Sequence, residues 1–201
     1  MKSLKSIYNF LAWYYRKLES IFIDNYLGVK TSGIISTIVP GYPDVYYCET
    51  LYYWHLRKIF DQVTIHKSDV FYDLGSGYGR VLFYAAEIGF SKIEGFELRP
   101  DAYALAIKNI AGYRNNKSCD ITIKCMDVAD VDVSKADVIY MYNPFGLATL
   151  KKVIEKNAVL PKGIQIIYFF NENIECVNYM NSLKWAKVEK VRKLPCNIYT
   201  T

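Results

Sequence analysis

Residues 70–86 (VFYDLGSGYGRVLFYAA) constrain the fold more than any other part of the chain. A short apolar and aromatic run, which contains Asp73, has the pattern of a strand covered on both faces. Glycines follow at positions 75, 77 and 79, and apolar side chains then resume at helical spacing. Because glycine tolerates positive φ and carries no Cβ, a ligand can lie directly against such a turn. The stretch therefore predicts a strand, a ligand-binding turn and a helix.

The spacing around the glycines separates two kinds of ligand. A dinucleotide-binding turn follows G-x-G-x-x-G/A, and its third small residue lets the helix pack closely on the strand. Arg80 stands at that third position, and Asp73 lies two residues before the first glycine. A carboxylate there would repel a pyrophosphate but can reach an amino or sulfonium group. The turn therefore favours a cationic ligand, and an NAD-dependent oxidoreductase is the least favoured alternative.

Strand patterns alternate with helix patterns in the rest of the chain. Further strands are expected at residues 92–98, 121–125, 136–142 and 164–170, and helices at residues 45–63, from 101 onward and at 147–159. Two last strand patterns, at residues 185–194 and 196–199, are separated only by Pro195, so they should pair antiparallel. The fold class predicted is α/β: a doubly wound, mostly parallel, seven-stranded Rossmann-like sheet with an antiparallel C-terminal edge pair, plus N-terminal helices.

The N-terminal region is expected to form a cap, made by residues 1–43, on a domain formed by residues 44–201. Seven apolar side chains form one helical stripe: Ile7, Phe10, Leu11, Tyr14, Leu18, Ile21 and Phe22. The stretch is too short and too interrupted by polar residues to span a membrane, and no signal-peptide cleavage site follows it. A stripe that packs on the domain or on a partner is favoured over one that lies on a membrane surface.

Charge and cysteine usage narrow the possible partners. Of the net charge of +5, residues 1–18 contribute +4 and residues 184–193 another +4, so the remainder is slightly acidic. A solvated surface is the simpler interpretation of both segments, and a weak membrane or anionic contact through residues 1–18 is the alternative. The five cysteines form no C-x-x-C pair and there are only two histidines, which predicts reduced thiols, a cytoplasmic location and no metal site.

Polar side chains stand at the ends of three predicted parallel strands. Glu97 ends the second strand, Asp127 follows the third and Asn143 follows the fourth. Ligands of such sheets bind at the carboxyl ends of the strands, where the strand order reverses. An acid at position 97 can accept both hydroxyls of a ribose, and a carboxylate at position 127 can accept the amine of an adenine. Together with Asp73, these residues indicate a nucleoside with a cationic end.

With these motifs the chain resembles the class I S-adenosylmethionine (SAM)-dependent methyltransferases over about residues 69–170. Residues 73–80 (DLGSGYGR) are similar to that family's first motif. The forms D-L-G-S-G-x-G-R-V, E-L-x-P and Y-N-P-F resemble a group of short bacterial methyltransferases. That group also carries a piece similar to residues 27–33 and a Tyr-x-x-Thr like the one at Tyr47 and Thr50. The first motif is also similar to that of the non-SET protein-lysine methyltransferases.

The resemblance implies SAM as the cofactor and a role for each site residue. The cofactor-binding residues would be Asp73, Gly75, Ser76, Gly77, Gly79, Arg80, Glu97, Leu98, Asp127 and Val128. Asn143 and the Pro144 carbonyl would accept hydrogen bonds from a target N–H, and Phe145 would supply a wall. Tyr47 and Thr50 would face the ligand from a lid.

The expected reaction is methyl transfer from SAM to a nitrogen nucleophile. The loop at residues 143–146 is similar to the Asx-Pro-Pro-aromatic loop of adenine, cytosine and glutamine N-methyltransferases, but it lacks the second proline. A protein lysine or another amine is therefore favoured as the acceptor over RNA or DNA. A SAM-binding module without catalytic activity is the remaining alternative.

Overall fold

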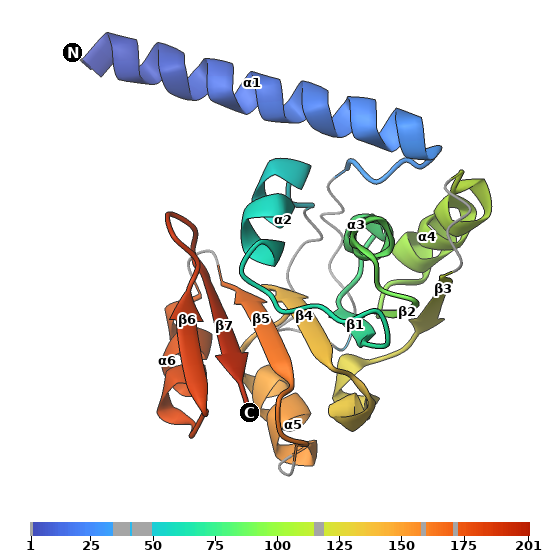
Figure 1. The fold of residues 1–201 in the computed structure, drawn as a ribbon, viewed down its shortest axis with the longest axis vertical. Coiled ribbons are helices and arrows are strands. Elements are labelled where there is room, and N and C mark those ends of the chain that lie inside the picture. Colours follow the sequence, from blue (N-terminus) through green and yellow to red (C-terminus); the bar gives the residue numbers. More distant parts are fainter. Residues whose placement is uncertain (1, 34–40, 42–49, 115–118, 158–159, 171–172) are drawn as a thin grey trace.

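The computed structural model describes residues 2–33, 41, 50–114, 119–157, 160–170 and 173–201. Its centre is a seven-stranded sheet of order β3-β2-β1-β4-β5-β7-β6 (Figure 1). The strands are β1 (Val70–Leu74), β2 (Lys92–Glu97), β3 (Asp120–Cys125), β4 (Val138–Tyr142), β5 (Gln165–Phe169), β6 (Lys187–Lys190) and β7 (Cys196–Thr200). β1 to β5 are parallel, and β7 pairs antiparallel with both β5 and β6. The predicted fold class is thereby confirmed, including the antiparallel pair at the edge.

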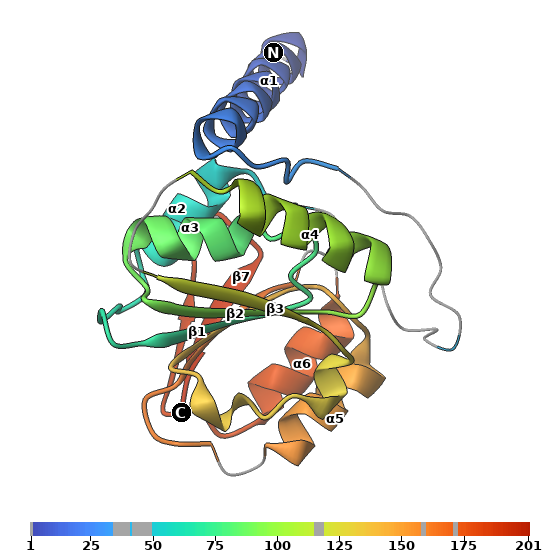
Figure 2. The same cartoon turned by 90° about the vertical axis from the view of Figure 1, so that its right-hand side faces the viewer.

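Helices cover both faces of the sheet. They are α1 (Lys2–Leu27), α2 (Tyr53–Phe60), α3 (Arg80–Ile88), α4 (Pro100–Gly112), α5 (Leu147–Lys156) and α6 (Ile174–Ser182). In Figure 2, α2, α3 and α4 lie on one side of the sheet, and α5 and α6 lie on the other. Each side has its own apolar core, because the buried side chains of the strands point alternately to the two faces. The sheet is thus shielded on both faces, as its continuous apolar strands require.

Two helices differ from the sequence-based expectation. The helix expected at residues 45–63 begins at Tyr53 and ends at Phe60, and residues 45–49 lie outside the described part of the chain. Tyr52 precedes this helix with extended backbone. Helix α6 was not predicted, because its sequence has only a weak apolar pattern; it begins after Asn173, whose side chain accepts a hydrogen bond from the Cys176 N–H.

The N-terminal helix α1 forms as predicted, but its apolar stripe does not pack on the domain. Ile7, Leu11, Leu18 and Phe22 are all exposed. The side of α1 that is buried instead carries Ser20, Asp24 and Leu27 near the end of the helix. The end of α1 is therefore attached through Ser20 and Asp24 together with Leu27, which belongs to the apolar core. Among the described residues, no helix has both the length and the apolar character needed to cross a bilayer.

Candidate functional site

The glycine turn connects β1 to α3 at the point where the strand order reverses, since β1 lies between β2 and β4. Gly75, Gly77 and Gly79 have φ angles of 89°, 53° and 89°, which are left-handed conformations that favour glycine. The N–H groups of Gly75 and Ser76 both donate to the Phe96 carbonyl, at 2.8 and 3.0 Å. The turn is therefore fixed to the carboxyl end of β2, with its backbone close to the neighbouring strand ends.

The turn also touches the loop after β4. A Cβ built on Gly75 would lie 2.5 Å from the Cβ of Pro144, which is closer than two carbon atoms that are not bonded to each other can approach. We therefore expect Gly75→Ala to lower the free energy of unfolding by about 3 kcal/mol or more, since it combines backbone strain with a steric clash. Chemical denaturation of the variant measures this loss.

Gly163→Ala is the matched control for that substitution. Gly163 has a similar φ of 90°, but a Cβ there meets no atom of the described residues within 4 Å. Gly163→Ala should lower the free energy of unfolding only through backbone strain, by about 1 to 2 kcal/mol. Equal losses in the two variants would contradict a close contact between the glycine turn and Pro144.

Two buried acids lie at the carboxyl ends of β1 and β2. Asp73 is 2% exposed, and Glu97 is 5% exposed. Burial raises the pKa of Asp73 well above its ordinary value, and the nearby charge of Glu97 raises it further. Burial likewise raises the pKa of Glu97, although the N–H groups of Arg99 and Gly77 counteract this. Such a pair is unfavourable while both groups are ionised, so it provides a favourable place for a cation.

Glu97 also holds the glycine turn in place. Its Oε2 accepts a hydrogen bond from the Gly77 N–H at 2.8 Å, and its Oε1 accepts one from the Arg99 N–H at 2.9 Å. Each carboxylate oxygen has a second lone pair, which leaves capacity for the hydroxyls of a ribose. Leu98, directly after it, is half-buried. The predicted ribose-binding acid is therefore positioned beside the turn by the turn's own backbone.

The predicted adenine-contacting pair lies after β3. The Asp127 side chain accepts a hydrogen bond from the Ala129 N–H at 2.8 Å and thereby caps a short 3-10 helix, Val128–Asp130. Val128 is buried in the apolar core on that side of the sheet. Asp127 is half-buried, so it remains accessible from one side. Within the turn, the Ser76 hydroxyl is buried and finds no hydrogen-bond partner among the described residues.

The loop after β4 brings Asn143 and Pro144 to the glycine turn. Asn143 has a φ of 37°, which is a strained conformation for a residue with a side chain. Its N–H donates to the Phe169 carbonyl at 2.9 Å, and its Oδ1 accepts a hydrogen bond from the Asn173 Nδ2 at 3.0 Å. Phe145 is buried in the apolar core, so its ring packs inside the domain and does not form the wall that was expected. Asn143 is thus held from both β5 and the start of α6.

Arg80 has a different role from the one expected. Its guanidinium is buried and donates to the Thr31 hydroxyl at 2.7 Å, the Leu51 carbonyl at 2.9 Å and Asp24 Oδ2 at 3.1 Å. It also donates to the Ser32 hydroxyl at 2.6 Å. These contacts use the planar, five-donor geometry of arginine, and they direct it toward the N-terminal segment. Arg80 therefore fastens the end of α1 and residues 31–32 to the start of α3.

The segment at residues 29–33 lies against the glycine turn. A Cβ on Gly33 would lie 2.7 Å from the Tyr78 ring. Asn109 of α4 accepts a hydrogen bond from the Lys30 N–H and donates to the Lys30 and Tyr78 carbonyls, so it links this segment to the turn. The Thr50 hydroxyl donates to the Thr31 carbonyl at 3.1 Å, which makes it part of the same support. Tyr47, the other residue expected in a lid, lies outside the described residues.

Sequence reasoning missed three of these supporting residues. Asp24, Asn109 and Asn173 are separated from their partners by 56, 31 and 30 residues. Asp24 stands out only as an acid near a basic N-terminal segment, and Asn109 only as a polar residue in an apolar helix. Neither signal names a partner, because these contacts depend on how the elements pack.

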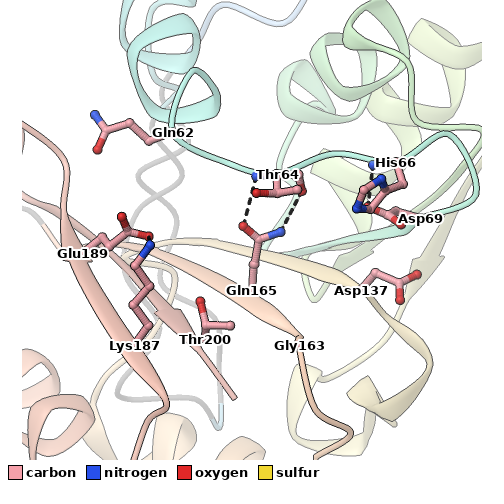
Figure 3. Close-up of a pocket in the computed structure, with 10 residues that line it drawn as sticks. All are labelled: Gln62, Thr64, His66, Asp69, Asp137, Gly163, Gln165, Lys187, Glu189 and Thr200. Carbon is pink, nitrogen blue, oxygen red and sulfur yellow. Dashed lines mark hydrogen bonds and ion pairs between the residues drawn. The ribbon is translucent and has the colours of Figure 1, made fainter.

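A polar cavity of about 410 Å³ lies at the opposite end of the sheet (Figure 3). Its lining comes from the segment before β1, from residues before or at the starts of β4 and β5, from β6 and from the end of β7: Gln62, Thr64, His66, Asp69, Asp137, Gly163, Gln165, Lys187, Glu189 and Thr200. The Thr64 backbone exchanges two hydrogen bonds with the Gln165 side chain. Because ligands of parallel sheets bind at the carboxyl ends, we do not assign this cavity to the reaction. Within the described parts of the chain, no cluster of three or more acids, histidines or cysteines could hold a metal ion.

Comparison with known proteins identifies structures with a similar fold. No curated protein sequence matches the chain significantly. A solved RNA methyltransferase from Salinibacter ruber, in complex with S-adenosyl-L-homocysteine, is 20% identical with a TM-score of 0.54, over 75% of this chain and 90% of that chain. A ribosomal protein L11 methylase from Lactobacillus delbrueckii subsp. bulgaricus is 19% identical with a TM-score of 0.51, over 73% of this chain and 75% of that chain. At sequence identities of 19% and 20%, the likeness shows a shared fold alone.

The family model described as histone methylation protein DOT1 matches residues 40–194. This range includes the glycine turn, the two buried acids and the loop after β4. Because it covers well over half of the sequence, the chain belongs to the DOT1 family of histone methylation proteins: it is a methyltransferase with a class I fold, and its cofactor is SAM.

Proposed function

We propose that this methyltransferase transfers the methyl group of SAM to a nitrogen nucleophile, namely the amine of a protein lysine or another amine. The observation that carries the proposal is the position of Asn143. It lies at the carboxyl end of β4, next to the glycine turn through Pro144, and it is only partly buried. An amide oxygen at this place can accept a hydrogen bond from an acceptor N–H and so orient the nitrogen lone pair.

The side chains around the turn fit SAM by their charge. Asp73, whose pKa is raised by burial beside Glu97, would hold the amino group, and a cation there relieves the unfavourable pairing of two acids. Glu97 would hold the ribose, and Asp127 with Val128 would contact the adenine. The bound cofactor supplies a methyl group already activated by its sulfonium, so the protein has only to place a neutral nucleophile in line with it.

Asn173 makes Asn143 suitable for this task. The Oδ1 of Asn143 accepts a hydrogen bond from Asn173, which fixes the orientation of the amide. A carbonyl oxygen has a second lone pair, so Oδ1 can still accept a hydrogen bond from an acceptor amine. The strained backbone at Asn143 is maintained by its hydrogen bond to Phe169. The residues of the loop therefore orient a nucleophile rather than activate it chemically.

The choice of a protein or amine acceptor has separate support. The description of the matched family refers to histone methylation, and histones are proteins. The two similar solved structures are named for an RNA methyltransferase and a ribosomal protein methylase, so the fold alone favours neither acceptor. The basic segments lie on α1 and around β6 at the far edge of the sheet, where Lys187 pairs with Glu189.

Asn143→Ala should lower kcat by roughly 100-fold while leaving the Kd for SAM unchanged, because it removes orientation of the acceptor and no cofactor contact. Asn173→Asp is the companion variant: it keeps an oxygen to cap α6 but loses the N–H that holds Asn143. Its kcat should fall without a loss of thermal stability. A loss of SAM affinity equal to the loss of kcat would instead make Asn143 a cofactor residue.

The acceptor class can be tested in a native lysate. Methyl-labelled SAM and the purified protein are added, and the labelled macromolecules are digested with protease or with nuclease. Release of the label by protease alone is the expected result, and a variant carrying Asn143→Ala should incorporate label roughly 100-fold more slowly. Release by nuclease would overturn the proposed acceptor and indicate RNA or DNA. We also infer a cytoplasmic location, because the four described cysteines form no disulfide with one another.

A further inference from the structure

Among the described residues, most of the large exposed apolar side chains lie on α1. Its exposed apolar and aromatic side chains are Leu4, Ile7, Tyr8, Phe10, Leu11, Trp13, Tyr14, Tyr15, Leu18, Ile21, Phe22 and Tyr26. Figure 1 shows α1 outside the layers formed by the sheet and the other helices. Surfaces of this extent mark a contact with something outside the domain.

The orientation of α1 is the reverse of that of an ordinary surface helix. An amphipathic helix normally turns its apolar side to the domain core. Here the polar side faces the domain: Asp24 accepts hydrogen bonds from Thr31 and Tyr53, and Glu19 pairs with Arg57 of α2. Arg16 lies over the Trp54 ring, 4.0 Å from its centre. These contacts fix the rotation of the helix, so the apolar side points away from the domain.

The basic residues of α1 indicate which class of partner its apolar side binds. Residues 1–18 carry four basic residues and no acid. The two acids further along the helix, Glu19 and Asp24, are paired with Arg57 and Arg80. Lys5 and Lys17 therefore have no acid on the same helix that is free to pair with them, and both are exposed. Basic side chains along an aromatic, apolar helix surface are complementary to an anionic lipid surface.

A second copy of the chain fits this surface less well. The residues Leu4, Ile7, Leu11, Tyr14, Leu18 and Ile21 follow heptad spacing, which two helices could share. The pairing would bring two segments of charge +4 together, with no acids at the flanking positions to form ion pairs between helices. Trp and Tyr side chains, by contrast, have an apolar body and a polar tip, which suits the boundary between headgroups and acyl chains.

We propose that α1 is an interfacial anchor that lies along an anionic phospholipid bilayer with its apolar side inserted. The helix does not span the bilayer, consistent with its interrupted apolar pattern. The anchor would hold the methyltransferase domain at the membrane surface through the contacts that Arg80, Asp24 and Arg57 make with the rest of the chain. It is independent of the nature of the methyl acceptor.

Co-sedimentation of the full chain with vesicles tests this proposal. We expect binding to phosphatidylcholine vesicles that contain roughly one third phosphatidylglycerol, and weak binding to phosphatidylcholine alone. Leu11→Ser/Leu18→Ser and, separately, Lys5→Glu/Lys17→Glu should each lower the affinity at least about tenfold. Raising the salt concentration should weaken the binding of the wild-type protein.

The control variant is Ile107→Ser/Val188→Ser, which removes two exposed apolar side chains elsewhere on the molecule. It should bind vesicles as the wild-type protein does, and all variants should keep their SAM affinity and melting temperature. The proposal is overturned if the wild-type protein does not bind anionic vesicles, or if the control loses binding equally. It is also overturned if the protein is a dimer in analytical ultracentrifugation that Leu11→Ser/Leu18→Ser dissociates while vesicle binding is unaffected.

Discussion

Asp73→Asn is expected to lower the affinity for SAM by about 30-fold or more and, at the same time, to stabilise the SAM-free protein. A charge-assisted contact with a buried carboxylate contributes about 2 kcal/mol to binding, and the amide retains the shape of the side chain without its charge. The ionised carboxylate is unfavourable in the free protein, because it is buried beside Glu97. Removing its charge therefore weakens cofactor binding and relieves the burial cost together.

The pH dependence of stability has a defined sign. The pKa of Asp73 is raised in the folded protein, so its contribution to stability is present at low pH and is lost as pH rises through that raised pKa. In Asp73→Asn this part of the pH dependence should disappear. Calorimetric titration gives the Kd, and denaturation of the SAM-free protein at several pH values gives the stability. Unchanged SAM affinity, with or without a change in stability, would exclude Asp73 from the cofactor site.

Glu97→Gln, at the neighbouring acid, is expected to differ from Asp73→Asn in its effect on stability. The amide oxygen can still accept a hydrogen bond from one of the two N–H groups that the carboxylate now binds, those of Gly77 and Arg99. SAM affinity should fall, but the gain in stability should be smaller than in Asp73→Asn, because a hydrogen bond that fixes the glycine turn is lost. A larger gain in stability than in Asp73→Asn would contradict the structural role of Glu97.

Arg80→Met should lower the free energy of unfolding by about 3 to 5 kcal/mol, because it leaves Asp24 buried without its charged partner. The guanidinium is 3.1 Å from Asp24 Oδ2, and both side chains are nearly inaccessible to solvent. The same change removes donors to Thr31, Ser32 and Leu51, so residues 31–33 should lose their position beside the glycine turn. SAM affinity is expected to fall as an indirect consequence.

Arg57→Met is the matched control on the same interface. Arg57 pairs with Glu19 and thereby also links α1 to the domain, but its side chain is 42% exposed. An ion pair accessible to water contributes about 1 kcal/mol or less. Chemical denaturation should separate the two variants clearly. Equal losses in stability would show that Arg80 acts only as a surface contact, contrary to its burial.

The sequence alone was enough to predict the strands of the sheet and which site residues stand at the strand ends. Apolar strands that end at Leu74, Glu97 and Tyr142 can be recognised locally, because side-chain periodicity and glycine positions are properties of neighbouring residues. Parallel strands then bring their carboxyl ends together, whatever the details of packing. The positions of Asp127 and Asn143 at that edge followed from the same rule. Helix α6 lacked a strong pattern and could not be recognised in this way.

Only the tertiary structure decided what several of these residues do. Arg80 was expected beside the cofactor, but its planar donors find Asp24 and the segment at residues 31–32, which lie far away in the chain. Phe145 was expected to face a ligand, but its ring is buried in the apolar core. The sequence showed the apolar stripe of α1 but not its direction. That direction depends on long-range contacts of the polar side of α1, which no local pattern contains.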